Sequence, residues 1–217
     1  MRFLLELNTL LFPVRCYGCR DLGFAICSNC RKHWNPHIYK SQIADLSVYS
    51  AVPYSAVARN ILLAAKEENQ KSADLLIVRA LSKSLETLFR NFPISAIVPI
   101  PSQPSSNRRR GRDFVSEISI SVARECGVAV LPMLHHQRVI RDQSKLNIAS
   151  RRENLAMALA IKPEYSGNYS AEKVVILDDL LTTGATIKEA NRALTKGGFL
   201  VQAAATACVA LRRREYP

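Results

Sequence analysis

Hydrophobic residues in the last quarter of the chain follow first a strand pattern and then a helix pattern. Residues 174–177 (Val-Val-Ile-Leu) form a short apolar run rich in β-branched residues, which is typical of a parallel strand covered on both faces. Ile187, Ala190 and Leu194 then recur at helical spacing, and the pair Gly197-Gly198 provides a stop signal. We therefore expect a buried strand, a short turn and a helix.

Similar alternation extends over most of the chain. The apolar runs predict strands at 47–53, 96–98, 128–131 and 199–211, and the helical patterns predict helices at 55–65, 73–89 and 114–125. Between 135 and 151 no period is visible, so we expect a loop that includes the adjacent His135 and His136. Strands that alternate with helices predict an α/β fold with a mostly parallel, doubly wound sheet.

The turn after the apolar run carries the most informative side chains. Asp178 and Asp179 follow the strand, at the end where open α/β sheets bind ligands. The next residues lie at a helix N-terminus, where hydroxyls and backbone N–H groups favour a phosphate: Thr182, Thr183, Gly184, Ala185 and Thr186. Carboxylates repel phosphate but accept hydrogen bonds from sugar hydroxyls, so the segment indicates a site for a sugar phosphate. The alternative is an ordinary strand, turn and helix with an Asp-rich loop.

Two Cys-x-x-Cys motifs near the N-terminus indicate a metal site. Cys16 and Cys19 are separated by a short connection from Cys27 and Cys30, and four thiolates at this spacing suit one tetrahedral Zn²⁺ with no open position for catalysis. Such an ion would stabilise the fold. Disulfides and redox thiols are the alternatives; neither a secretory signal nor a neighbouring βαβ unit favours them.

The strand, paired acids and Thr/Gly-rich turn resemble the phosphoribosyl pyrophosphate signature of the type I phosphoribosyltransferases. Together with the cysteine motifs, they make the chain similar to the ComF family of competence-associated phosphoribosyltransferase-like proteins over nearly its whole length. Further matches are Tyr54 and Lys66, a Pro-rich strand end at 97–101, and Arg151 with Asn154. The chain departs from the family at 110–114, where Arg-Gly-Arg-Asp-Phe replaces Arg-Gly-Phe-Asn-Gln, and in the residues that follow Lys66.

The resemblance implies a type I phosphoribosyltransferase-like fold and a reaction that displaces pyrophosphate from ribose with the help of Mg²⁺. Asp178 and Asp179 would hold the ribose hydroxyls as catalytic residues, and 182–186 would hold the 5-phosphate. Lys66, Arg138 and Arg151 are candidates for contacts to pyrophosphate. The family also implies a role in natural competence, with single-stranded DNA or DNA-uptake proteins as partners. A non-catalytic nucleic-acid-binding or regulatory protein on the same fold is the alternative.

The charge of the chain is compatible with more than one kind of polyanion. Thirty Lys and Arg residues against 18 Asp and Glu give a net charge of +12 over 217 residues. The basic segment, defined as Arg108, Arg109, Arg110 and Arg112, is interpreted as a cover for pyrophosphate, a surface for a nucleic-acid backbone, or a solvated loop.

Length and hydropathy suggest two parts. Residues 1–42 are too polar to form an independent core, so we expect an apolar helix and a zinc module there, and a phosphoribosyltransferase-like domain over 43–217. Glu6 and Asn8 interrupt the apolar N-terminus, so neither a signal peptide nor a membrane span is expected. Free thiolates that bind zinc agree with a cytoplasmic location.

Overall fold

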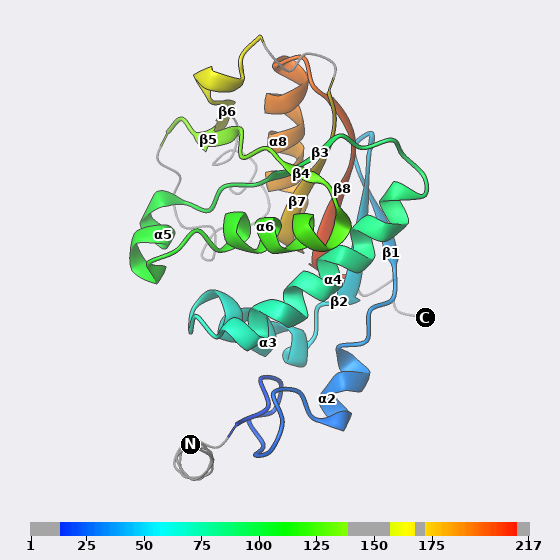
Figure 1. Ribbon diagram of the computed structural model, residues 1–217, viewed down its shortest axis with the longest axis vertical. Coiled ribbons are helices and arrows are strands. Elements are labelled where there is room, and N and C mark those ends of the chain that lie inside the picture. Colours follow the sequence, from blue (N-terminus) through cyan, green and yellow to red (C-terminus); the bar gives the residue numbers. More distant parts are fainter. Residues whose placement is uncertain (1–13, 139–156, 168–171, 212–217) are drawn as a thin grey trace.

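The computed structural model describes residues 14–138, 157–167 and 172–211 (Figure 1). These residues form a six-stranded sheet, a separate two-stranded sheet and the helices that pack around them. In chain order the elements are α2 (Ser28–His33), β1 (Tyr39–Ile43), β2 (Leu46–Pro53), α3 (Ala56–Lys66), α4 (Lys71–Phe89), β3 (Ala96–Pro99), α5 (Pro104–Arg110), α6 (Phe114–Cys126), β4 (Ala129–Val130), β5 (Leu134–His136), β6 (Leu159–Ile161), the 3-10 turn η2 (Pro163–Tyr165), β7 (Lys173–Leu181), α8 (Ala185–Lys196) and β8 (Leu200–Val209).

The large sheet has the strand order β1-β2-β8-β7-β3-β4. All neighbouring strands in it run parallel except β1 and β2, which form an antiparallel pair at one edge. Strands β5 and β6 pair antiparallel in the small sheet. The predicted α/β fold with a mostly parallel sheet is confirmed.

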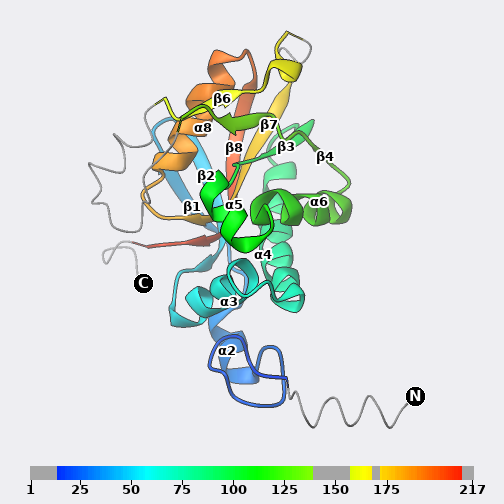
Figure 2. The same ribbon diagram turned by 90° about the vertical axis from the view of Figure 1, so that its left-hand side faces the viewer.

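Helices cover both faces of the large sheet, as Figure 2 shows, with α3, α4 and α6 on one face and α8 on the other. The apolar run of β7 explains this arrangement. Val175 and Leu177 belong to the core shared with α4, whereas Val174 and Ile176 belong to the core shared with α8. Because successive side chains of a strand point to opposite faces, a strand buried on both sides needs a continuous apolar run.

Several elements differ from those predicted. The loop expected from residue 135 is wrong for its first residues, because His135 and His136 lie in β5, where they pair with β6. The basic segment is not a loop either, since α5 contains Arg108, Arg109 and Arg110. Pro104 in its first turn and Gly111 in the left-handed conformation after its end bound this helix. The expected helix in the first residues lies outside the described part of the chain.

The cysteine motifs lie at one end of the molecule and the small sheet at the other (Figures 1 and 2). Cys16, Cys30 and Trp34 are buried in the same apolar cluster as residues of α3 and α4. The predicted division into residues 1–42 and 43–217 stays a prediction, and its boundary falls inside β1 (Tyr39–Ile43).

Candidate functional site

A cleft opens beyond the end of β3, beside the last residues of β7. The chain leaves β3 toward α6 on one face of the sheet and leaves β7 toward α8 on the other, so this edge is a topological switch point, where open α/β sheets bind ligands. The cleft has a volume of about 410 Å³. It is lined by Lys66, Ile100, Pro101, Ser102, Gln103, Ser105, Ser106, Arg109, Arg110, Val115, His136, Leu159, Asp178, Asp179, Leu180 and Thr186.

The paired acids lie within β7 and not in a turn after it. Strand β7 continues to Leu181 because it stays paired with β8, whereas β3 ends opposite Leu177. Asp178 and Asp179 therefore lie just beyond the end of β3, where the missing neighbour leaves room for the cleft. The difference from the sequence prediction concerns the end of the strand, and the acids still lie at its carboxyl end.

Lys66, the last residue of α3, pairs with one of the two acids. Its Nζ lies 2.6 Å from Oδ2 of Asp179, and the backbone N–H of Asp179 donates to Oδ1 of Asp178 at 2.9 Å. Ser55 caps the start of α3, because its side chain accepts a hydrogen bond from the N–H of Ala58. This cap stabilises the helix that carries Lys66. The structure thus brings together three residues that are far apart in the sequence.

The pKa values of this group move in different directions. Burial raises the pKa of Asp178, and the negative charge of Asp179 raises it further. Burial would also raise the pKa of Asp179, but the charge of Lys66 outweighs it and the pKa falls below its usual value. For Lys66, burial opposes the charged form, yet Asp179 and Asp178 raise its pKa. At neutral pH, Lys66 and Asp179 form an ion pair. The charged form of Asp178 is disfavoured.

The predicted phosphate loop connects β7 to α8. Gly184 has φ 74°, and a Cβ built on it would lie 2.4 Å from Cδ1 of Ile43, so glycine is required by both conformation and space. The N–H of Ala185 donates to Oγ1 of Thr183 at 3.4 Å. Of the five loop residues predicted to bind phosphate, Thr186 lines the cleft, whereas Thr182, Thr183, Gly184 and Ala185 do not.

Of the other two predicted contacts to pyrophosphate, Arg138 and Arg151, the structure describes only Arg138. Arg138 is exposed and is not among the lining residues. Arg151 lies outside the described residues. In contrast, Arg109 and Arg110 of α5 line the cleft, although the sequence pattern gave them no more weight than the other residues of the basic segment.

The basic segment as a whole is not a free cationic surface. Arg112 is buried and donates to both carboxylate oxygens of Asp74, at 2.9 and 3.3 Å, and its Nη2 lies 2.9 Å from Glu117. Arg110 is paired with Glu67 at 2.6 Å. The interpretation of the segment as a solvated loop is therefore wrong for Arg110 and Arg112, because ion pairs hold both against the protein.

His136 is a cleft residue that the sequence analysis missed. Its Nε2 lies 3.0 Å from the carbonyl oxygen of Pro101, which can only accept, so Nε2–H is the donor. Burial lowers the pKa of His136. This places a neutral imidazole on the wall of the cleft that also contains the two acids. No local signal could have found it, because the position depends on the pairing of β5 with β6.

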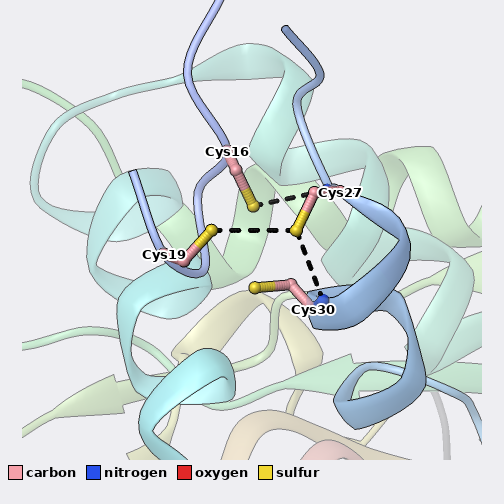
Figure 3. A group of neighbouring side chains, drawn as sticks. All are labelled: Cys16, Cys19, Cys27 and Cys30. Atoms are coloured by element: carbon pink, nitrogen blue, oxygen red, sulfur yellow. Dashed lines mark hydrogen bonds between the residues drawn. The ribbon is translucent and has the colours of Figure 1, made fainter. Parts of the chain in front are cut away.

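The four cysteines of the N-terminal motifs converge (Figure 3). Their sulfur atoms all lie within 4.8 Å of one another, so the group could hold a metal ion. Backbone N–H groups donate to two of the sulfurs, from Cys27 to Cys16 at 3.3 Å and from Cys30 to Cys27 at 3.4 Å. A Cβ on Gly18 would lie 2.6 Å from Sγ of Cys30, so glycine is needed for the tight turn around the sulfurs. These features fit the donor set of a four-thiolate metal site.

The cysteine group is tied to the helix that carries Lys66. Nδ2 of Asn60 in α3 donates to the carbonyl oxygen of Gly18 at 2.7 Å. An exposed ion pair joins Arg20 to Glu68 at 2.6 Å, just after the end of α3. The group is therefore fixed to the main body by polar contacts as well as by the buried Trp34.

Among the described residues, no helix combines the length and the apolar character needed to cross a lipid bilayer.

No family model matches this sequence, and no curated protein matches it. Solved structures with a similar arrangement include an adenine phosphoribosyltransferase, with 14% sequence identity and a TM-score of 0.46, covering 84% of this chain and 89% of the other. The adenine phosphoribosyltransferase of Saccharomyces cerevisiae is 15% identical, with a TM-score of 0.44 over 85% of this chain and 89% of the other. The orotate phosphoribosyltransferase of Aeropyrum pernix is 14% identical, with a TM-score of 0.39 over 83% and 77%.

Proposed function

We propose that this chain binds phosphoribosyl pyrophosphate and transfers its phosphoribosyl group to an acceptor nucleophile. The observation that carries the proposal is one cleft that contains Asp178, Asp179 and Lys66 together with Thr186 in the first turn of α8. This combination supplies acceptors for sugar hydroxyls, a cation, and a helix N-terminus within one volume suited to a small ligand.

The binding roles follow from the chemistry of each group. The loop before α8 and the first turn of α8, which contains Thr186, would hold the 5-phosphate, since this end of the helix carries partial positive charge and N–H donors. Asp178 and Asp179 would accept hydrogen bonds from the two ribose hydroxyls. Lys66 would keep one of these acids ionised and contribute positive charge near the pyrophosphate.

In the proposed reaction a bond forms between the anomeric carbon and the acceptor, and the bond from that carbon to pyrophosphate breaks. Such a step needs positioning and charge stabilisation rather than a protein nucleophile. Asp178 and Asp179, which both line the cleft, would hold Mg²⁺ through their carboxylate oxygens, the kind of ligand that this ion prefers. When bound, the ion would supply charge that stabilises the leaving group.

For the cysteine group we propose a structural Zn²⁺. Cys16, Cys19, Cys27 and Cys30 would all be ligands, which leaves no position for substrate. The metal would stabilise the turn at Gly18 and the start of α2, and would not take part in the transfer. A cytoplasmic location, which suits reduced thiols, stays a prediction.

A role in DNA uptake, with single-stranded DNA or uptake proteins as partners, is the finer proposal that the ComF resemblance suggests. Ion pairs hold Arg110 and Arg112 against the protein, which leaves Arg108 and Arg109 as the exposed residues of the basic segment. Arg109 is itself paired with Glu67 at 3.2 Å. Replacing Arg108 and Arg109 with Ala should weaken binding of single-stranded DNA and reduce its salt dependence. If DNA binding and its salt slope do not change, this segment is not the DNA surface.

Calorimetric titration with phosphoribosyl pyrophosphate and Mg²⁺ tests the central proposal. The parent protein should bind, and the double variant Asp178→Asn/Asp179→Asn should not. Glu86→Gln is the matched control, because it removes an exposed carboxylate of α4 that lies outside the cleft. A parent protein that gives neither heat nor a thermal shift would overturn the proposal.

Turnover is a separate measurement. Release of pyrophosphate from phosphoribosyl pyrophosphate should depend on an added nitrogenous base or nucleic acid, since the acceptor completes the reaction. Tight binding without release under any acceptor would leave a regulatory, non-catalytic protein as the better description.

A further inference from the structure

A carboxylate bridges two arginines at the rim of the cleft. Oε1 of Glu67 accepts from Nε and Nη2 of Arg110, at 3.0 and 2.6 Å, and Oε2 accepts from Nη2 of Arg109 at 3.2 Å. Glu67 directly follows Lys66 at the end of α3, and both arginines belong to the last turn of α5. The bridge therefore connects the two helices on either side of the cleft.

Arg110 is held more firmly in the wall than the carboxylate, whereas Arg109, at 65% exposed, lies at the rim. The side chain of Arg110 is 9% exposed and that of Glu67 is 31% exposed. Both Arg109 and Arg110 line the cleft, whereas Glu67 does not. A rotation of the Glu67 side chain into solvent would leave the two guanidinium groups facing the cleft.

Glu67 is an unfavourable residue for the position it occupies. It caps the C-terminal end of α3, where the helix dipole disfavours a negative charge. Hydrogen bonding to Arg110 lowers the pKa of Glu67, so the carboxylate is charged at neutral pH. Arg109 and Arg110 thus stabilise a negative charge that the dipole of α3 disfavours.

Guanidinium groups bind phosphate oxygens with the same geometry as carboxylate oxygens. A pyrophosphate group offers more oxygens and more charge than Glu67 and can contact both arginines at once. We propose that Arg109 and Arg110 form the subsite for the pyrophosphate group, and that Glu67 occupies it as an internal anion which the ligand displaces. The identity of this ligand rests on the function proposed above; the exchange of anions does not.

A purely structural role for Glu67 makes the opposite prediction. If the bridge only holds α5 in place, removing the carboxylate should loosen Arg109 and Arg110 and weaken the binding of any anion. If Glu67 competes with the ligand, removing the carboxylate should strengthen binding. The two cases differ in the sign of one measured change.

The test is a titration with inorganic pyrophosphate, without metal and at low salt. We expect Glu67→Gln to bind about three- to tenfold more tightly than the parent protein, the range for loss of a partly exposed competing ion pair. Glu68→Gln is the matched control, because its carboxylate is adjacent in the chain but pairs with Arg20. It should bind like the parent. Arg110→Gln should lose most of the binding.

Two outcomes would overturn the proposal. One is an affinity in Glu67→Gln that is equal to or lower than that of the parent protein, and this includes the case in which neither binds. The other is loss of cooperative thermal unfolding in both Glu67→Gln and Glu67→Ala, which would show that the fold depends on the bridge. The substrate is tested separately. If Glu67→Gln binds pyrophosphate more tightly but the parent protein does not bind phosphoribosyl pyrophosphate with Mg²⁺, the subsite is retained and the proposed function is rejected.

Discussion

The two acids of the cleft should respond in opposite ways to the same conservative substitution. Asp179→Asn removes the carboxylate that lies 2.6 Å from Nζ of Lys66. Asp178→Asn removes a carboxyl group whose charged form burial and Asp179 both disfavour, and the new Oδ1 can still accept from the N–H of residue 179. At neutral pH we expect Asp179→Asn to lower the free energy of unfolding and Asp178→Asn to raise it.

The size of the expected loss in free energy of unfolding depends on how exposed the ion pair between Lys66 and Asp179 is. The side chains of Lys66 and Asp179 are 26% and 9% exposed, so the pair lies between the surface and buried cases. Exposed pairs contribute about 0–1 kcal/mol, and breaking a buried pair costs about 3–5 kcal/mol. We expect Asp179→Asn to cost about 2 kcal/mol, which corresponds to about 4–8 °C in Tm for a chain of this length.

The pH dependence distinguishes the two acids. The lowered pKa of Asp179 means that its stabilising contribution is present above the unfolded pKa and is lost as the pH falls through the folded pKa. The cost of Asp179→Asn should therefore disappear in acid. The raised pKa of Asp178 means that its penalty grows as the pH rises above the unfolded pKa and is complete above the folded pKa, so the gain from Asp178→Asn should increase from about pH 4 upward.

Urea unfolding followed by circular dichroism from about pH 2 to pH 8 would measure both effects, with Glu86→Gln as the control for removal of an acid. The same proteins should be titrated with phosphoribosyl pyrophosphate and Mg²⁺. A stabilised Asp178→Asn that no longer binds would identify the acid as a residue kept for function at the expense of stability. Equal destabilisation by both variants at neutral pH would refute the charge assignment.

Three further predictions concern other parts of the chain. Purified, reduced protein should contain about one zinc per chain by elemental analysis, and Cys19→Ser should lower metal content and Tm together; zinc-free native protein would contradict this. Gly184→Ala should lower the free energy of unfolding by about 1–2 kcal/mol because of its φ of 74°, and further because of the clash with Ile43. In a double-mutant cycle measured by urea unfolding, Ile43→Ala should recover part of this loss, and strictly additive losses would contradict the contact. Arg112→Ala should cost about 3–5 kcal/mol by urea unfolding because it leaves Asp74 without its buried partner, and a cost below about 1 kcal/mol would show that the pair is solvated.

The strands and helices with clear apolar periods could be predicted from the sequence. The strand at 174–177, the helix after it and the long helix ending at Phe89 each bury a large face, so their side-chain pattern records their environment. Strand β1 (Tyr39–Ile43) and helix α5 (Pro104–Arg110) lack such a pattern. The first is an edge strand, and the second is polar and held by ion pairs, so hydrophobic periodicity does not report them.

The candidate site was predictable only in part for the same reason. Asp178, Asp179 and Thr186 belong to one continuous segment, whose order of residue types is informative by itself. The bridge from Glu67 to Arg110 and the contact of His136 with Pro101 join segments that meet only after the sheet has formed. No local pattern encodes such pairs.

Helix α3 has a fixed length between two anchors. Asn60, near the middle of the helix, contacts the turn at Gly18, and Lys66, its last residue, contacts Asp179, so one helix positions two separate groups. These anchors lie about 9 Å apart along the axis, and each inserted residue would turn one relative to the other by about 100°. Substitutions on the exposed side of α3 should therefore be tolerated during evolution, whereas insertions or deletions between residues 60 and 66 should be eliminated. The spacing of these two residues, more than the identity of those between them, is the property that relatives of this chain are expected to share.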